Sequence, residues 1–220
     1  MNILIACEES QRVCMAFRKK GHNAFSCDII ECSGGHPEWH IQQNVLPLLN
    51  GNCKFETTDG TKHEIKGKWD MIIAFPPCTR LCTTGQRWLY FGDNEYRARK
   101  IQEQQKAIVF FMMFALADCD KIVIENPQGI MSTAYRKPDC IYNPYDFEGE
   151  TEIKKTCLWL KGLEPLKGTR AKPLPKEERT HGIFKSHFDG KVYTWGSEEC
   201  AKMRSKTPFG VANAMSDQWG

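Results

Sequence analysis

The stretch WDMIIAFPPCTRLC at residues 69–82 joins an apolar run to an abrupt, proline-bound end. The run has the length and the isoleucine content of a buried strand. Pro76 and Pro77 stop it, because proline lacks the amide hydrogen that a central strand donates to its neighbour. Cys78 follows at once, so the sequence predicts a thiol at the end of a core strand.

Further apolar runs alternate with helical patterns along the first two thirds of the chain. Strands are expected at 2–6, 23–29, 69–75 and 121–127, and helices at 8–21 and 96–119. An Asp-Gly turn inside 53–65 predicts a hairpin, which we interpret as an insertion in the α/β pattern. A further strand is predicted at 151–160. This alternation predicts an α/β fold with a mostly parallel sheet.

In such sheets the ligand site lies at the carboxyl ends of the strands. Four segments should therefore meet at one edge although they are far apart in sequence: 6–10, Asp28, 75–78 and 125–127.

Cys78 and Glu125 are the candidate reactive groups at this edge. A thiol on a proline-bound turn is positioned and partly accessible, as a nucleophile requires, although a structural thiol is also possible. A carboxylate at the edge of a buried sheet costs free energy unless it has a partner or a task; accepting backbone hydrogen bonds is the plainer alternative. Together the two groups suit attack on an electron-poor ring whose nitrogen bonds the carboxyl group.

Composition narrows the setting. The 220 residues, 41% of them hydrophobic, suit one globular domain. No apolar run reaches 18 residues and the N-terminus lacks the features of a signal peptide, so we expect a cytoplasmic protein with no membrane partner. Eleven cysteines, odd in number and irregular in spacing, predict buried thiols rather than disulfides.

Positive charge gathers late in the chain. Residues 161–206 hold 11 Lys and Arg against 6 Asp and Glu, whereas the whole chain carries only +3. A basic segment suits a polyanion such as nucleic acid, because neutralised phosphates release counterions. A solvated, lysine-rich loop surface explains the charge equally well.

FPPC at 75–78 followed by IENP at 124–127 resembles the Pro-Cys and Glu-Asn-Val motifs of the cytosine-5 DNA methyltransferases, and the chain is most similar to the small, phage-encoded members. The resemblance implies a Rossmann-like S-adenosylmethionine-dependent methyltransferase fold. It also implies that Cys78 attacks carbon 6 of cytosine while Glu125 interacts at nitrogen 3, after which carbon 5 accepts the methyl group. The base must leave the stack for this.

The same resemblance assigns binding residues by position in the family's motif order. Residues implied to hold S-adenosylmethionine are Ala6, Cys7, Glu8, Ser10, Asp28, Asn44, Phe75 and Pro76. Residues implied to contact the base or the DNA backbone are Pro77, Thr79, Asn126, Lys154 and Lys155. For the two lysines, ordinary solvated surface charge is at least as good an explanation.

The resemblance also divides the chain. It implies a catalytic core at 1–160, a basic segment at 161–206 in place of a target-recognition region, and a C-terminal segment at 207–220 that packs back on the core. The chain departs from the family in its first loop, ACEESQ, which lacks the usual glycines, and in Thr79, where the family has glutamine. The short basic segment suggests low sequence selectivity, or a nucleotide or RNA substrate instead of duplex DNA.

Two other classes of function stay open. A zinc-dependent nucleobase deaminase has His-x-Glu and Pro-Cys-x-x-Cys motifs; this chain has His36, Glu38, Cys78 and Cys82, with the cysteines one residue too far apart. Because no spacing matches a common zinc site, we expect no metal. A nucleic-acid-binding protein on a catalytically degenerate methyltransferase fold is the non-enzymatic alternative.

Overall fold

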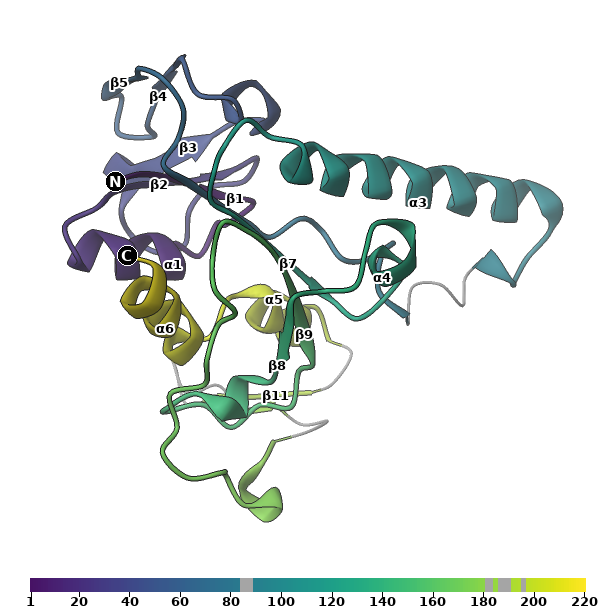
Figure 1. Ribbon diagram of the computed structural model, residues 1–220. Helices are drawn as coiled ribbons and strands as arrows, with labels where there is room; N and C mark the ends of the chain where they lie inside the picture. Colours follow the sequence, from purple (N-terminus) through teal and green to yellow (C-terminus); the bar gives the residue numbers. More distant parts are fainter. Residues whose placement is uncertain (84–88, 181–183, 186–190, 195–196) are drawn as a thin grey trace.

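The computed structural model describes residues 1–83, 89–180, 184–185, 191–194 and 197–220. Its centre is a seven-stranded sheet of order β3-β2-β1-β6-β7-β9-β8 (Figure 1). Along the chain these strands are β1 (Asn2–Ala6), β2 (Asn23–Asp28), β3 (His40–Gln42), β6 (Met71–Ala74), β7 (Ile122–Pro127), β8 (Cys140–Tyr142) and β9 (Thr156–Lys161). The first five are mutually parallel, whereas β9 runs antiparallel between β7 and β8. The predicted α/β fold with a mostly parallel sheet is confirmed.

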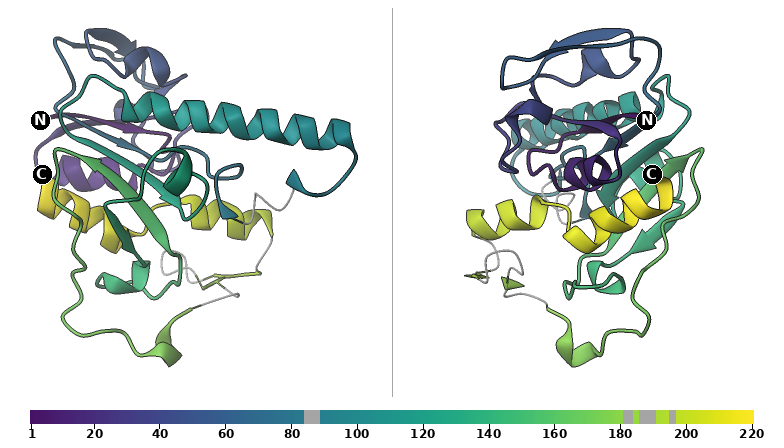
Figure 2. Two further views of the ribbon diagram at one scale, coloured as in Figure 1. Left: turned by 45° about the vertical axis from the view of Figure 1, so that its right-hand side comes forward. Right: turned by 90° about the vertical axis from the view of Figure 1, so that its left-hand side faces the viewer.

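Helices cover both faces of this sheet. They are α1 (Arg12–Lys19), α3 (Asn94–Ala115), α4 (Met131–Ala134), α5 (Glu198–Ser205) and α6 (Phe209–Trp219). Two small antiparallel pairs, β4 (Cys53–Glu56) with β5 (Lys62–Ile65) and β10 (Phe184–Lys185) with β11 (Val192–Tyr193), stand apart from the main sheet. Short 3-10 turns occupy Pro37–Trp39, Leu46–Leu48, Pro144–Asp146 and Lys176–Glu178. Figures 1 and 2 show α1 and α6 together on one face and α3 on the other.

The central strands are apolar on both sides because both of their faces are covered. In β1, Leu4 and Ala6 join the core beneath α3, while Ile3 and Ile5 join the core beneath α1 and α6. All four side chains are fully buried. This explains why the strand reads as a continuous apolar run instead of an alternating one.

The C-terminal residues lie against the start of the chain. From α6, Val211, Met215 and Trp219 enter the same buried cluster as Val13 and Phe17 of α1. The Trp219 indole also donates a hydrogen bond to the carbonyl oxygen of Glu164 at 3.0 Å. Helix α6 is therefore part of one face of the sheet and not an appendage.

Strand order places a topological switch point, where α/β sheets bind their ligands, between β1 and β6. The chain leaves β1 through α1 to β2 on one side, and later returns to β6 on the other side of β1. Such a topological switch opens a crevice at the carboxyl ends of the two strands. Numbered within the sheet alone, the order is 3-2-1-4-5-7-6 with the seventh strand antiparallel, which is a Rossmann-like arrangement.

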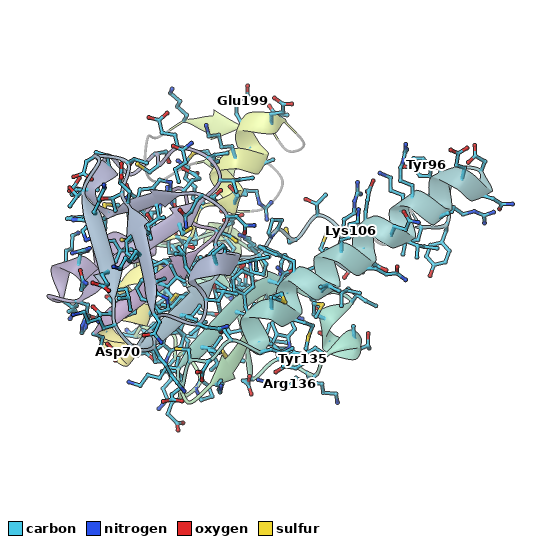
Figure 3. The ribbon with its side chains drawn as sticks, turned by 90° about the horizontal axis from the view of Figure 1, so that it is seen from above. Asp70, Tyr96, Lys106, Tyr135, Arg136 and Glu199 are labelled. Atoms are coloured by element: carbon cyan, nitrogen blue, oxygen red, sulfur yellow. The ribbon has the colours of Figure 1, made fainter. Side chains whose placement is uncertain are left out.

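Helix α3 extends well past the body of the molecule. The Asp93 carboxylate begins it by accepting a hydrogen bond from the Tyr96 amide at 2.8 Å. Its buried residues, Phe111 and Phe114, lie in the last turns. The N-terminal half, marked by Tyr96 in Figure 3, projects away from the sheet. In the described part of the chain, no helix combines the length and apolarity needed to cross a membrane.

Replacing Phe111 by alanine should test this packing. The ring is fully buried and meets the Trp159 ring edge-on at a centroid distance of 5.2 Å. We expect the free energy of unfolding to fall by about 3 to 5 kcal/mol, because truncation leaves a cavity. Val109→Ala, on the exposed side of the same helix, should change it by less than about 0.5 kcal/mol. Urea denaturation measures both; equal losses would contradict the observed burial.

Candidate active site

Two turns at the carboxyl ends of neighbouring strands form the centre of the site. Strands β6 and β7 pair in parallel with Ala74 opposite Ile124, so the chain leaves both at the same edge. The Asn126 side chain, fully buried, donates a hydrogen bond from Nδ2 to the carbonyl oxygen of Pro76 at 2.8 Å. The proline corner and the end of β7 are thereby joined.

A second set of contacts joins the segments that follow. The Ile130 amide donates to the Leu81 carbonyl oxygen at 2.9 Å, and the Thr83 amide donates to the carbonyl oxygen of Gln128 at 3.2 Å. A Cβ atom added to Gly129 would lie 1.9 Å from the Leu81 carbonyl oxygen. Only glycine allows this approach, which holds the turn carrying Cys78 against the turn that follows Glu125.

Glu125 lies close enough to Cys78 to affect the ionisation of its thiol. Burial raises the pKa of the Cys78 thiol, and the negative charges of Glu125 and Cys82 raise it further. Burial also raises the pKa of Glu125, while the Lys154 ammonium opposes both increases. The structure thus brings together the thiol, the carboxyl group and one of the two lysines expected from sequence.

The lysine is held in place by the C-terminal end of α5. Lys154 donates a hydrogen bond from Nζ to the Arg204 carbonyl oxygen at 2.7 Å. Lys155, next along the chain, is exposed. On the strand side, burial and the Glu125 charge raise the pKa of the buried Tyr142 hydroxyl.

The first loop and the ends of β1, β2 and β6 lie next to this centre. The Phe75 amide donates to the Ala6 carbonyl oxygen at 2.9 Å, and the Cys7 amide donates to that of Cys27 at 2.7 Å. Cys7 has a positive φ of 59°. After burial, the charge of Asp28 is the largest cause that raises the pKa of the Cys7 thiol. Cys7, Asp28 and Phe75 therefore share the crevice edge.

Glu8 has a different position from its neighbours in the loop. Its carboxylate is 4% exposed and accepts hydrogen bonds from the amides of Val13 at 2.7 Å and Cys14 at 3.2 Å. The N-terminus of α1 is thus occupied by a side chain of the protein. Burial raises the pKa of Glu8 from 4.5 to about 7, against the lowering effect of the two amides.

The other residues expected at the site lie around these groups. Ser10 and Pro76 are buried, while Pro77 and Thr79 are exposed. Asn44 is exposed beyond β3 and accepts a hydrogen bond from the Leu46 amide at 3.0 Å. Among the described residues, Oδ1 of Asn126 is buried without a hydrogen-bond partner.

Sequence reasoning missed three side chains that border the site: Tyr142, Arg204 and Lys206. Tyr142 lies on β8, a three-residue strand too short to show a periodic pattern. Arg204 and Lys206 entered only as part of the charge of the basic segment. Their individual contacts depend on how α5 docks, which no local pattern in the sequence encodes.

The side chains of the deaminase hypothesis do not assemble in the described part of the chain, where no group of three His, Cys, Asp or Glu side chains could hold a metal ion. His36 stacks on Trp39 with ring centroids 3.9 Å apart, and its Nδ1 lies 2.9 Å from Glu38. Cys82 instead continues the turn after Cys78, donating its amide to the Cys78 carbonyl oxygen at 3.0 Å.

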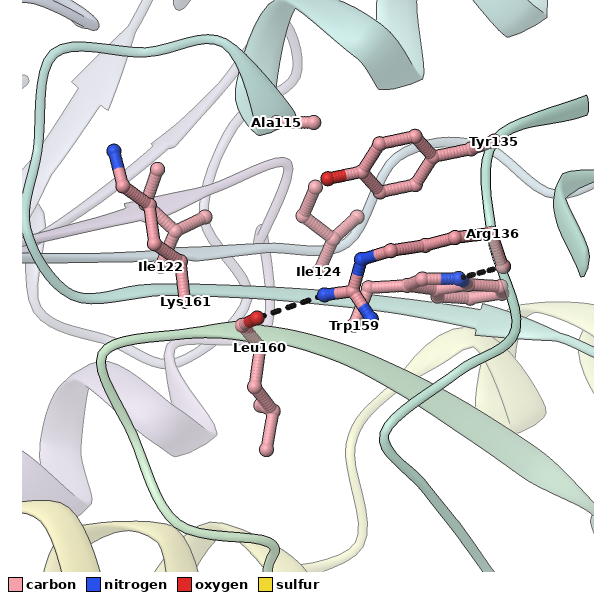
Figure 4. Close-up of a pocket in the computed structure, with 8 residues that line it drawn as sticks. All are labelled: Ala115, Ile122, Ile124, Tyr135, Arg136, Trp159, Leu160 and Lys161. Carbon is pink, nitrogen blue, oxygen red and sulfur yellow. Dashed lines mark hydrogen bonds between the residues drawn. The ribbon is translucent and has the colours of Figure 1, made fainter.

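A cavity of about 250 Å³ lies elsewhere, against the α3-facing side of β7 and β9 (Figure 4). Its lining residues are Ala115, Ile122, Ile124, Tyr135, Arg136, Trp159, Leu160 and Lys161. Two hydrogen bonds connect its lining residues: Arg136 donates to the Leu160 carbonyl oxygen, and Trp159 donates to the Arg136 carbonyl oxygen. It contains none of the candidate site residues.

Comparison with known proteins adds little to this geometry. No family profile matches the chain, and no curated protein matches it. Among solved structures, a prophage protein of E. coli described as a "putative DNA modification methyltransferase" is similar with a TM-score of 0.44 and 14% identity. The match covers 79% of this chain and 52% of that one, so the chain spans about half of its length. A likeness at this level carries no argument about function.

Glu8 should make the stability of the protein depend on pH. Because folding raises its pKa from 4.5 to about 7, its contribution is fully present below pH 4.5 and is lost as pH rises through 7. In the wild type, the free energy of unfolding should fall by about 3 kcal/mol as pH rises between these limits. In Glu8→Gln this fall should be absent. Urea denaturation from pH 4.5 to 8.5 measures the difference between the variant and the wild type. The exposed Glu31→Gln is the control, and a pH-independent difference for Glu8→Gln would contradict the assignment.

Proposed function

We propose that the protein transfers a methyl group from S-adenosylmethionine to carbon 5 of cytosine in DNA, through a covalent adduct with Cys78. The observation that carries the proposal is the joining of Cys78, Glu125 and Lys154 at the carboxyl edge of a Rossmann-like sheet, beside a separate crevice for a cofactor. Neither motif alone specifies the reaction; their electrostatic contact supports it.

The first loop fits a cofactor without phosphate groups. In dinucleotide-binding Rossmann folds the N-terminus of the first helix binds the pyrophosphate. Here the Glu8 carboxyl group already occupies the amides of Val13 and Cys14, so these amides are not free to bind a pyrophosphate. S-adenosylmethionine has no phosphate and carries a positive sulfonium, so the loop suits it.

Other residues at the crevice match the remaining parts of this cofactor. The half-buried Asp28 carboxylate suits the ribose hydroxyls, and Ile29 and Ile30, 74% and 52% exposed, offer an apolar surface for adenine. Cys7 and Phe75 border the same edge. When bound, S-adenosylmethionine supplies an electrophilic methyl group.

The reactive groups can transfer the proton that must move when the thiol adds to the base. The Cys78 thiol passes its proton to the Glu125 carboxylate, with the Lys154 ammonium favouring the thiolate. As Sγ bonds to carbon 6, Glu125 gives this proton to nitrogen 3, and the electron pair of the 5,6 double bond becomes available at carbon 5. Once carbon 5 carries the methyl group, loss of the carbon 5 proton to a base expels the thiolate and restores the 5,6 double bond, and nitrogen 3 returns its proton to Glu125. A carboxyl group with a raised pKa suits the donor role.

Basic elements flank the edge where a nucleic acid would approach. The projecting half of α3 carries Arg97, Arg99 and Lys100 against Glu95 and Glu103. The left view of Figure 2 shows this half of α3 and helix α5 of the basic segment both reaching beyond the sheet, and the right view shows that they point in different directions. Exposed Tyr90 and Phe91 precede α3, and aromatic rings of this kind can stack on unpaired bases.

Labelled methyl transfer tests the proposal. We expect transfer from methyl-labelled S-adenosylmethionine to cytosine-containing DNA, and Cys78→Ser should abolish it because serine is a much weaker nucleophile. DNA containing 5-fluorocytosine should trap the wild type covalently, since fluorine cannot leave carbon 5 as a proton does. Scintillation counting and denaturing electrophoresis measure the two outcomes.

Cys82→Ser, one turn beyond the nucleophile, is the matched control and should still form the adduct. RNA and deoxycytidine nucleotides belong in the same panel to define the substrate. DNA binding without label transfer would favour the non-enzymatic alternative, and stoichiometric zinc in the purified protein would favour the deaminase.

Cofactor selectivity gives an independent prediction. The chain should bind S-adenosylhomocysteine but not NADH, because Glu8 blocks the helix terminus that a pyrophosphate needs. Asp28→Asn should weaken binding by roughly 10- to 100-fold through loss of charge-assisted hydrogen bonds. Isothermal titration calorimetry measures both, with the exposed Glu31→Gln as control. Tight binding of NADH would refute the cofactor assignment.

A further inference from the structure

Residues 204–207 connect the basic segment to the core, and we call them the 204–207 link. They join the end of α5 to the start of α6. On one side they contact the stretch that carries Lys154. Arg204 forms an ion pair with Glu152, Nε to Oε1 2.8 Å, with the two side chains only 18% and 9% exposed. The carbonyl oxygen of Arg204 accepts the hydrogen bond from Lys154.

On its other side the link contacts Glu9 of the first loop and Ser33 in the segment after β2. Lys206 donates from Nζ to the Ser33 hydroxyl at 2.7 Å and lies 3.8 Å from the Glu9 carboxylate. The side chains of Lys206 and Glu9 are each 13% exposed. One residue further, Arg12 of α1 donates to the Thr207 carbonyl oxygen at 3.0 Å in a buried position. Through Arg204, Lys206 and Thr207 the link therefore contacts both the stretch that carries Lys154 and the elements at the carboxyl ends of β1 and β2.

The rest of the basic segment reaches the same stretch from another direction. The Ile153 amide donates to the Thr180 carbonyl oxygen at 3.1 Å, and the Thr180 amide donates to that of Thr151 at 2.9 Å. Residues 151–154 are thus held between Thr180 and the 204–207 link. Within the described residues of α5 itself, only Cys200 is buried, so the placement of this helix depends on the link.

These contacts resist independent movement of their two ends. Ion pairs with little exposure lose much more when one partner is withdrawn than exposed pairs do, because the remaining charge stays poorly solvated. A force on the basic segment that shifts Arg204 also shifts Lys206, two residues away. Ligands bound at two sites are coupled when both favour the same position of a shared element.

We propose that Arg204 and Lys206 are positioning residues that couple nucleic-acid binding on the basic segment to cofactor binding on the first loop. The inference rests on the proposed function, and it adds that each ligand strengthens the binding of the other. Arg204 acts on Lys154 and Glu152, and Lys206 acts on Glu9 and Ser33. Thermodynamic linkage requires the same factor in both directions.

The test measures the dissociation constant of S-adenosylhomocysteine by calorimetry, without DNA and with a saturating cytosine-containing duplex. For the wild type we expect binding about 5-fold or more tighter with DNA, within the usual range of coupling. Lys206→Met should bring this factor close to one, and Lys206→Arg should restore part of it. Lys202→Met, an exposed lysine of α5, should weaken DNA binding equally with and without cofactor and leave the factor unchanged.

Ser33→Ala is a second variant, used in case Lys206→Met does not fold. It removes only the hydroxyl that accepts from Lys206 at an exposed position, and it should lower the factor in a protein whose thermal melting is unchanged. A factor of one in the wild type, or the wild-type factor in both Lys206→Met and Ser33→Ala, overturns the inference. Absence of any cofactor binding in the wild type would instead contradict the proposed function, so the two failures are distinguishable.

Discussion

The close approach of the two turns that follow β6 and β7 is the constraint on which the candidate site depends. Parallel pairing brings both strand ends to one edge, but it does not bring their side chains into contact. The bond from Asn126 to the Pro76 carbonyl oxygen and the approach of Gly129 to Leu81 hold the two turns together. With the turns joined, a thiol and a carboxyl group that are 47 residues apart share one electrostatic environment.

Glu8 decides the chemistry of the first loop in a comparable way. A helix N-terminus at a topological switch point normally attracts an anionic ligand. By placing a carboxyl group of its own there, the chain satisfies the amides internally, and this supports the proposal of a ligand without phosphates. The absence of the usual glycines fits this arrangement, because no pyrophosphate has to approach the backbone closely.

Sequence reasoning was right about the long apolar runs and weaker for short or polar elements. The central strands and the hairpin around Asp59 and Gly60 lie where their patterns predict. Strands β3 and β8 were missed, because three residues are too few for a period and their hydrogen bonds come from distant neighbours. Glu8 was expected to face a cofactor, and its partnership with the helix amides could not be read from a loop without a capping motif.

The sequence by itself determined the α/β alternation, the two proline-ended strands and the residues that lie at their carboxyl ends. These follow from local rules, since burial on both faces demands continuous apolar runs and proline ends a central strand. Only the tertiary structure decided that Lys154 faces Cys78 and Glu125 while Lys155 is exposed, and that Arg204 and Lys206 reach two different parts of the site. Those choices depend on the docking of a segment 50 residues away, and contacts at that distance leave no periodic trace in the sequence.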